Sequence, residues 1–129
     1  MTTRLHRGDL PDIARYKGAV AIDTETMGLD LARDRLCVVQ LSPGDGSADV
    51  VQIPPHAKDA PNLKRLLADK SLLKIFHFAR FDLGMLYKAF GGICTTSAEP
   101  SPGESWTTQS RSRARSRPIV SVSIATAPL

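Results

Sequence analysis

The chain has 129 residues, 42% of them hydrophobic, and its 17 Lys and Arg against 13 Asp and Glu give a formal net charge of +4. This length leaves room for one small domain, and so mild a charge excess gives no strong electrostatic footprint for long nucleic acid. The two cysteines do not make a disulfide framework. No secretory segment or membrane-length apolar stretch is found near the N-terminus, which favours a reduced, cytoplasmic setting away from membranes.

Residues 1–92 alternate apolar runs with turn signals, as the sequence of a folded domain does. A short helix is expected over residues 9–17, with Pro11 at an early helical position. Strands are then expected over residues 19–24, 34–42 and 48–53. The turn signal at residues 43–46 indicates that these three strands form an antiparallel meander. A helix, a fourth strand and a second helix should follow over residues 61–69, 74–78 and 79–90.

The remaining residues, 93–129, differ in composition and are rich in Ser, Thr, Pro and Arg. They have too little apolar surface to offset the entropy of ordering, so we expect a disordered tail over Cys94–Arg117. Alternating arginines between Arg111 and Arg117 leave a second reading open, a basic arm that touches phosphates. The sequence thus predicts one domain over residues 1–92 and a tail over residues 93–129.

Two carboxylates, Asp23 and Glu25, lie two residues apart at the end of an apolar run. On a strand, residues i and i+2 point to the same face, so both groups should project into one small volume. A bound cation would relieve their repulsion, and hard cations such as Mg²⁺ or Mn²⁺ prefer oxygen ligands. The alternative is a strand end whose polar residues merely face water. The pair alone does not decide between these readings.

A third carboxylate, Asp82, lies on the predicted helix over residues 79–90. It shares one helical face with Met85, Leu86 and Ala89, an otherwise apolar stripe that should point inward. Burying an aspartate is costly unless something pairs with it. Alone, Asp82 is most simply an early-helix residue that complements the helix dipole. Beside Asp23, it becomes a third acidic ligand from a neighbouring element.

The order Asp-x-Glu on a first strand and then a helix-borne Asp resembles the DEDD 3′–5′ exonucleases. The stretches IDTETMGL, RLCVVQLSPGDG and IFHFARFDLGML are similar to the RNase D branch, especially the small bacterial nano-RNase C type, over about residues 13–92. The resemblance implies an α/β, RNase H-like core, a mixed sheet with an antiparallel three-strand start and flanking helices, C-terminally truncated. It further implies two divalent metals, Mg²⁺ or Mn²⁺, and hydrolysis of short RNA from its 3′ end. Because this type assembles as rings, a homo-oligomer is possible.

By this resemblance, Asp23 bridges both metals, Glu25 helps to hold the ion that activates water, and Asp82 supports the other ion. A set of nearby side chains would contact the terminal nucleotide: Thr24, Met27, Gly28, Leu29, His77, Phe78 and Phe81. For all of these except Thr24, a structural alternative stands beside the functional one. Leu29 can wedge against a base or be a core leucine, and the two phenylalanines can stack on a base or pack in the core.

The third exonuclease motif of the family, Tyr-x-x-x-Asp or His-x-x-x-Asp on a later helix, does not occur in this sequence. Asp82 is the last aspartate, and only Glu99 and Glu104 are acidic beyond it. A two-metal site that lacks one carboxylate should bind metal weakly and misplace the attacking water. Three readings follow: an exoribonuclease-type domain that is impaired in this chain, a non-catalytic remnant or subunit partner of an intact copy, and a product that does not fold stably.

Overall fold

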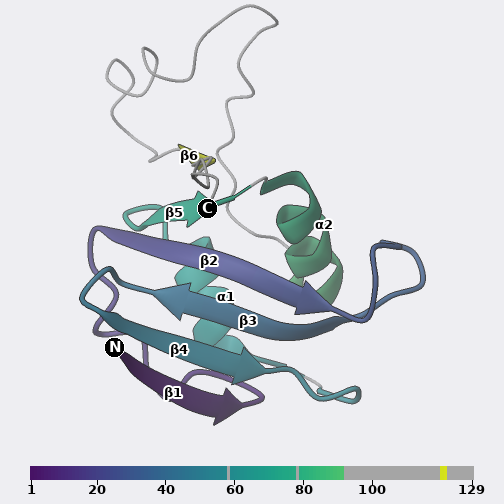
Figure 1. Ribbon diagram of the computed structural model, residues 1–129, viewed down its shortest axis with the longest axis horizontal. Coiled ribbons are helices and arrows are strands. Elements are labelled where there is room, and N and C mark those ends of the chain that lie inside the picture. The colour runs from purple at the N-terminus through teal and green to yellow at the C-terminus, as the bar shows by residue number, and fades with distance from the viewer. Residues whose placement is uncertain (58, 78, 92–119, 122–129) are drawn as a thin grey trace, which may run out of the picture.

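One mixed sheet with two helices makes up the computed structural model, which describes residues 1–57, 59–77, 79–91 and 120–121. The strand order is β1-β4-β3-β2-β5-β6 (Figure 1). The strands are β1 (Thr2–Arg7), β2 (Ala19–Thr26), β3 (Leu36–Ser42), β4 (Ser47–Gln52), β5 (Leu73–Phe76) and β6 (Val120–Ser121). The helices are α1 (Pro61–Ala68) and α2 (Ala79–Phe90). The predicted domain boundary and the predicted disorder over Cys94–Arg117 lie outside the described residues. Within the predicted tail, the short strand β6 pairs in parallel with β5, which the sequence did not predict. Among the described residues, no helix is long and apolar enough to cross a membrane.

The centre of the sheet confirms the predicted antiparallel meander. Strand β3 pairs antiparallel with both β2 and β4, and β5 joins β2 in parallel on the other side. The connection between β3 and β4 is the predicted turn, in which Gly44 and Gly46 both adopt positive φ. This is the mixed α/β arrangement expected of an RNase H-like core.

The first strand, β1, is a finding that the sequence did not predict. It pairs in parallel with β4 at the edge of the sheet, and its one leucine, Leu5, is exposed. Its sequence, TTRLHR, lacks the alternation of apolar residues that identifies a half-buried strand. Backbone pairing and polar contacts of Arg4 and His6 with the buried Asp49 hold it instead.

The helix predicted over residues 9–17 is wrong, because the chain there follows an irregular path with a single turn near Tyr16. Asp9 caps a different helix. Its carboxylate oxygens accept the backbone N–H groups of Asn62 and Leu63 at 2.8 Å each, and these belong to the first turn of α1. The Asn62 side chain in turn donates to the carbonyl of Leu10 at 2.8 Å. The segment over residues 9–17 therefore caps the N-terminus of α1 instead of forming a helix of its own.

The core lies on one face of the sheet. Helix α1, which lies behind the sheet in Figure 1, buries Leu63, Leu66 and Leu67 as its sequence predicts. Strand β2 alternates, with Val20, Ile22 and Thr24 buried and the intervening residues more exposed. Helix α2 adds Met85 and Leu86 to the same cluster. Because the helices cover only this face, alternate residues of β2 face away from the core.

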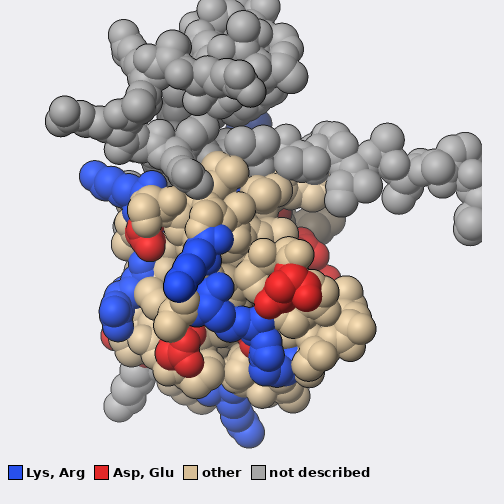
Figure 2. Space-filling model, turned by 90° about the vertical axis from the view of Figure 1, so that its left-hand side faces the viewer, with Lys and Arg blue, Asp and Glu red and all other residues tan. Residues whose placement is uncertain are grey.

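Charged side chains of both signs lie on the surface at the left of Figure 1. Figure 2 shows basic side chains running across the described part of this face, with acidic side chains beside them. Arg15 pairs with Asp45 at 3.2 Å and with Asp49 at 2.7 Å. Such pairing neutralises part of the positive charge and agrees with the mild net charge.

Candidate active site

Strand β2 places Asp23 and Glu25 side by side on the face of the sheet that the helices leave open. Both are exposed, whereas Thr24 between them is buried on the helix-covered face. The strand register shifts directly after Glu25, which pairs with Val38, while Thr26 pairs with Leu36. Cys37 is the extra residue of this bulge and is half-buried. Bulges of this kind are common beside active sites because they re-aim side chains.

Helix α2 carries Asp82 in its first turn, and only 6% of this residue is exposed. The inward position predicted for Asp82, Met85 and Leu86 is confirmed, but Ala89 is exposed. The hydroxyl of Thr24 donates a short hydrogen bond to Oδ1 of Asp82. Burial raises the pKa of Asp82; this hydrogen bond opposes the rise, and the negative charge of Asp23 adds to it. The second motif, which contains Asp82, therefore contacts the first through Thr24. The charge of Asp23 is near enough to affect the pKa of Asp82.

The donor chemistry of these residues fits a hard cation, but their arrangement fits it only in part. Asp23 and Glu25 offer exposed oxygen ligands on one face of β2. The Asp82 carboxylate is turned toward Thr24 on the other face. Across the described ranges, no group of three or more His, Cys, Asp or Glu side chains is placed to hold a metal ion. The structure thus brings Asp82 to Thr24 and leaves the carboxylate pair by itself.

The predicted substrate-contacting residues are dispersed around this pair. Met27 and Leu29 are 69% and 86% exposed, so the core alternative for Leu29 is wrong. His77 is exposed just beyond the end of β5, and Phe78 lies outside the described residues. Phe81 is half-buried and packs against the hydrophobic core, which favours the structural reading for that side chain.

Two residues that sequence reasoning did not single out, Asp34 and Lys88, hold the loop that carries Met27 and Leu29. Asp34 was read as the first residue of a strand, but it precedes β3 and is buried. Lys88 donates to the backbone carbonyls of Ala32 and Asp34 at 3.1 and 2.8 Å. The burial of Asp34 is what distinguishes it, and burial cannot be recognised from a single sequence.

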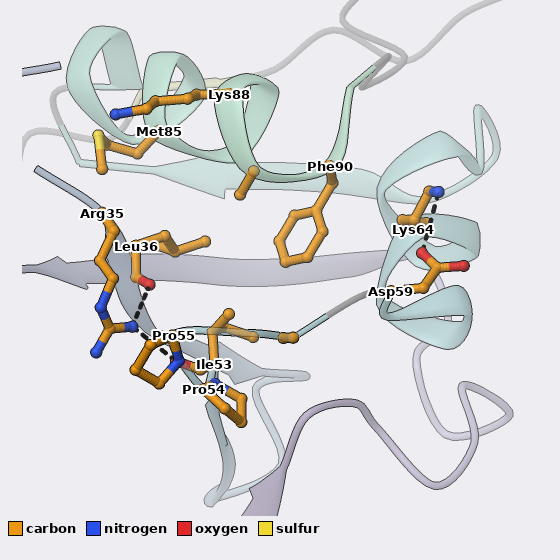
Figure 3. A pocket seen from close by; sticks show the side chains of 12 residues that line it. Arg35, Leu36, Ile53, Pro54, Pro55, Asp59, Lys64, Met85, Lys88 and Phe90 are labelled. Carbon is orange, nitrogen blue, oxygen red and sulfur yellow. Dashed lines mark hydrogen bonds and ion pairs between the residues drawn. The ribbon is translucent and has the colours of Figure 1, made fainter. Parts of the chain in front are cut away.

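A pocket of about 230 Å³ lies elsewhere, between α2, the start of β3 and the segment after β4 (Figure 3). Its cations already have partners: Arg35 donates to the Ile53 carbonyl at 2.9 Å, and Lys64 pairs with Asp59 at 3.1 Å. None of the three candidate carboxylates lines it. The pocket is therefore separate from the candidate active site.

The comparison with protein families defines the class of this protein. A family model described as a 3′–5′ exonuclease matches residues 10–99, which is more than half of the chain. The chain therefore belongs to the 3′–5′ exonuclease family. Within that family it is similar to NrnC and to ribonuclease D.

Individual relatives support that placement. The structure matches NrnC of Brucella melitensis with 63% sequence identity and a TM-score of 0.70 over 72% of this chain and 46% of that one. Ribonuclease D of Granulibacter bethesdensis is 39% identical over 79 residues, which are 61% of this chain and 20% of that protein. Ribonuclease D of Escherichia coli is 29% identical, with a TM-score of 0.52 over 61% of this chain and 20% of that one.

The chain spans less than half of the NrnC structure and a fifth of the two ribonucleases. Brucella melitensis NrnC has been solved with bound Mg²⁺ and with bound pGG. The match covers both predicted exonuclease motifs, since Asp23, Glu25 and Asp82 all fall between residues 10 and 99.

Proposed function

We propose that residues 1–92 carry the first two motifs of an exoribonuclease domain that removes nucleotides from the 3′ end of short RNA. The observation that carries this proposal is the exposed pair Asp23 and Glu25 on one face of β2, with Asp82 on the next helix, in a chain of the 3′–5′ exonuclease family. The Mg²⁺-bound structure of NrnC supports the use of a divalent metal. Mn²⁺ has the same preference for oxygen ligands.

Asp23 and Glu25 would hold the metal from the open face, and Asp82 would add a third carboxylate on leaving Thr24. When bound, two such ions activate water and stabilise the leaving oxygen of a phosphodiester. The chain's own residues position the rest: β2 fixes the carboxylate pair, and the exposed Met27 and Leu29 lie just beyond it, where a terminal base would be received. By the family resemblance, Asp23 would help to hold both ions, Glu25 would help to hold the ion that activates water, and Asp82 would support the other ion.

The substrate class follows from the relatives and from the surface. NrnC has been solved with pGG, a dinucleotide, and the other relatives are ribonucleases. The formal net charge of only +4 suits a short oligoribonucleotide better than a long one. A homo-oligomer remains part of this proposal by the same resemblance, and a cytoplasmic setting remains an expectation from the sequence.

One observation favours a second function, a non-catalytic remnant or a subunit that pairs with an intact copy. The third exonuclease motif is not among these 129 residues, and Asp82 bonds to Thr24 instead of joining the other carboxylates. A misplaced ligand costs orders of magnitude in rate. We therefore expect turnover by this chain to be strongly impaired relative to a four-carboxylate site.

Cleavage of 5′-labelled RNA dinucleotide and heptanucleotide by the purified chain in Mn²⁺ or Mg²⁺ tests the function. Asp23→Asn removes a charge at the site, and Asp12→Asn removes a charge from the exposed segment before β2. Shortening from the 3′ end that Asp23→Asn abolishes and Asp12→Asn preserves would establish the exoribonuclease. No turnover by a folded wild-type chain would favour the non-catalytic role, and equal activity of both variants would exclude this site.

A further inference from the structure

The loop between β2 and β3, residues 27–35, combines an exposed apolar tip with a fixed base. Met27 and Leu29 present most of their surface to water. In contrast, Asp34 at the base of the loop is only 6% exposed. The loop follows the carboxylate pair, exposes apolar side chains and is anchored at its base. These are features of a recognition surface.

The anchor within the loop is the carboxylate of Asp34. Its Oδ2 accepts the backbone N–H of Asp30 at 3.0 Å, and the backbone N–H of Asp34 donates to the Asp30 carbonyl at 2.8 Å. Oδ1 accepts Nε of Arg33 at 3.0 Å. A Cβ added at Gly28 would overlap Oδ2 of Asp34, so these two residues meet without any space for a side chain. Gly28 has no positive φ that would itself demand glycine.

A second set of contacts fastens the same loop to α2. Lys88 donates to the carbonyl of Asp34 at 2.8 Å and to that of Ala32 at 3.1 Å. One turn earlier, Leu31 packs against Gly84, where an added Cβ would lie 3.0 Å from Cδ2 of Leu31. Residues i and i+4 lie on one face of a helix, so both contacts come from one side of α2. The helix that carries Asp82 and the loop are therefore joined in two places.

We propose that Asp34 is a positioning residue that sets the Met27–Leu29 tip of the loop against the terminal base of a short oligoribonucleotide. This inference rests on the proposed function and adds to it the device that determines where the base lies. Through Lys88 and Leu31, the loop keeps a fixed register with Asp82, and through β2 it follows directly from Glu25. Gly28 is glycine because the Asp34 carboxylate occupies the place of its side chain, and not because the RNA needs that space.

A double-mutant cycle between Gly28 and Asp34 tests this inference. The variants are Gly28→Ala, Asp34→Ala and their combination, with Asp59→Ala as a control that removes an aspartate outside the loop. The first readout is hydrogen exchange at the Asp30 amide, which needs no ligand. The second is calorimetric binding of pGG in Ca²⁺, which offers oxygen coordination in place of Mg²⁺.

We expect Asp34→Ala to speed exchange at the Asp30 amide and to weaken pGG binding, each by about tenfold, because an unfastened loop must be ordered on binding. Gly28→Ala should weaken binding in the wild type but add nothing once Asp34 is alanine. Asp59→Ala should leave both readouts unchanged. Unaltered exchange in Asp34→Ala would overturn the inference, as would a Gly28→Ala penalty of equal size in both backgrounds. If the wild type binds no pGG, the proposed function fails, and exchange alone decides whether Asp34 fixes the loop.

Discussion

The hydrogen bond from the Thr24 hydroxyl to Asp82 determines where the third candidate carboxylate lies. Alternation along β2 sends Asp23 and Glu25 to the open face and Thr24 to the covered face, so a carboxylate reaching in from α2 meets Thr24 first. The sequence predicted the pairing of the two motifs but not the partner. The position of a helix beside a strand depends on packing that the alternation alone does not specify.

Replacing Thr24 by valine should destabilise the fold, because it keeps the shape but removes the hydroxyl that donates to the buried Asp82 carboxylate. The expected loss in the free energy of unfolding is about 1–3 kcal/mol, measured by urea denaturation. Thr24→Ser keeps a hydroxyl and is the matched control. Equal stability of the two variants would mean that Asp82 lies with the other carboxylates in solution.

At the scale of elements, the sequence predicted the meander and both helices correctly, because their apolar periodicity is regular. Leu63, Leu66 and Leu67 recur at helical spacing, and all three are buried. The failures share one cause. Helix 9–17 was predicted from capping signals that serve α1, and β1 was missed because its stability comes from β4 and Asp49. In both places, contacts with distant residues override local preference.

Asp9→Ala tests the cap of α1. Two backbone N–H groups of the first helical turn lose their acceptor, so we expect the free energy of unfolding to fall by about 1–2 kcal/mol. Asp12→Ala is the comparison, since the Asp12 side chain accepts only the exposed Ala14 N–H. Thermal melting of the two variants measures the difference. If both lower the melting temperature equally, Asp9 has no special part in the helix.

For the whole molecule, the buried Asp49 joins three parts of the chain. Although it is only 2% exposed, it accepts hydrogen bonds from Arg4 and His6 of β1, and from Arg15 and Tyr16 of the segment before β2. Burial alone would raise the pKa of Asp49, but these hydrogen bonds and the nearby arginine charges lower it overall. Burial of Tyr16 and its hydrogen bond to Asp49 raise the pKa of the Tyr16 hydroxyl. The edge strand and the preceding segment are thus held by one ionised group.

The pH dependence of stability follows from the lowered pKa of Asp49. Its contribution is fully present above the unfolded-state value of about 4 and is lost as the pH falls through the lower folded-state value. Asp49→Asn should therefore lower the free energy of unfolding by about 1–3 kcal/mol at pH 7, because a neutral amide is a weaker acceptor than the carboxylate for the donors around it. The gap between variant and wild type should narrow below about pH 4.

Urea unfolding at several pH values measures this gap, and Asp59→Asn serves as the control because its pair with Lys64 is exposed. That control should stay near the wild type at neutral pH. A gap for Asp49→Asn that does not change as the pH is lowered would show that the ionised carboxylate is not what joins the three parts.

The central claim is that Asp23 and Glu25 on the open face of β2 form a divalent cation site. Its most direct test is titration of the folded chain with Mn²⁺, followed by electron paramagnetic resonance of the free ion. We expect saturable binding that Asp23→Asn or Glu25→Gln weakens at least about tenfold, with Asp12→Asn binding like the wild type. Equal Mn²⁺ affinity in all four proteins would contradict the claim.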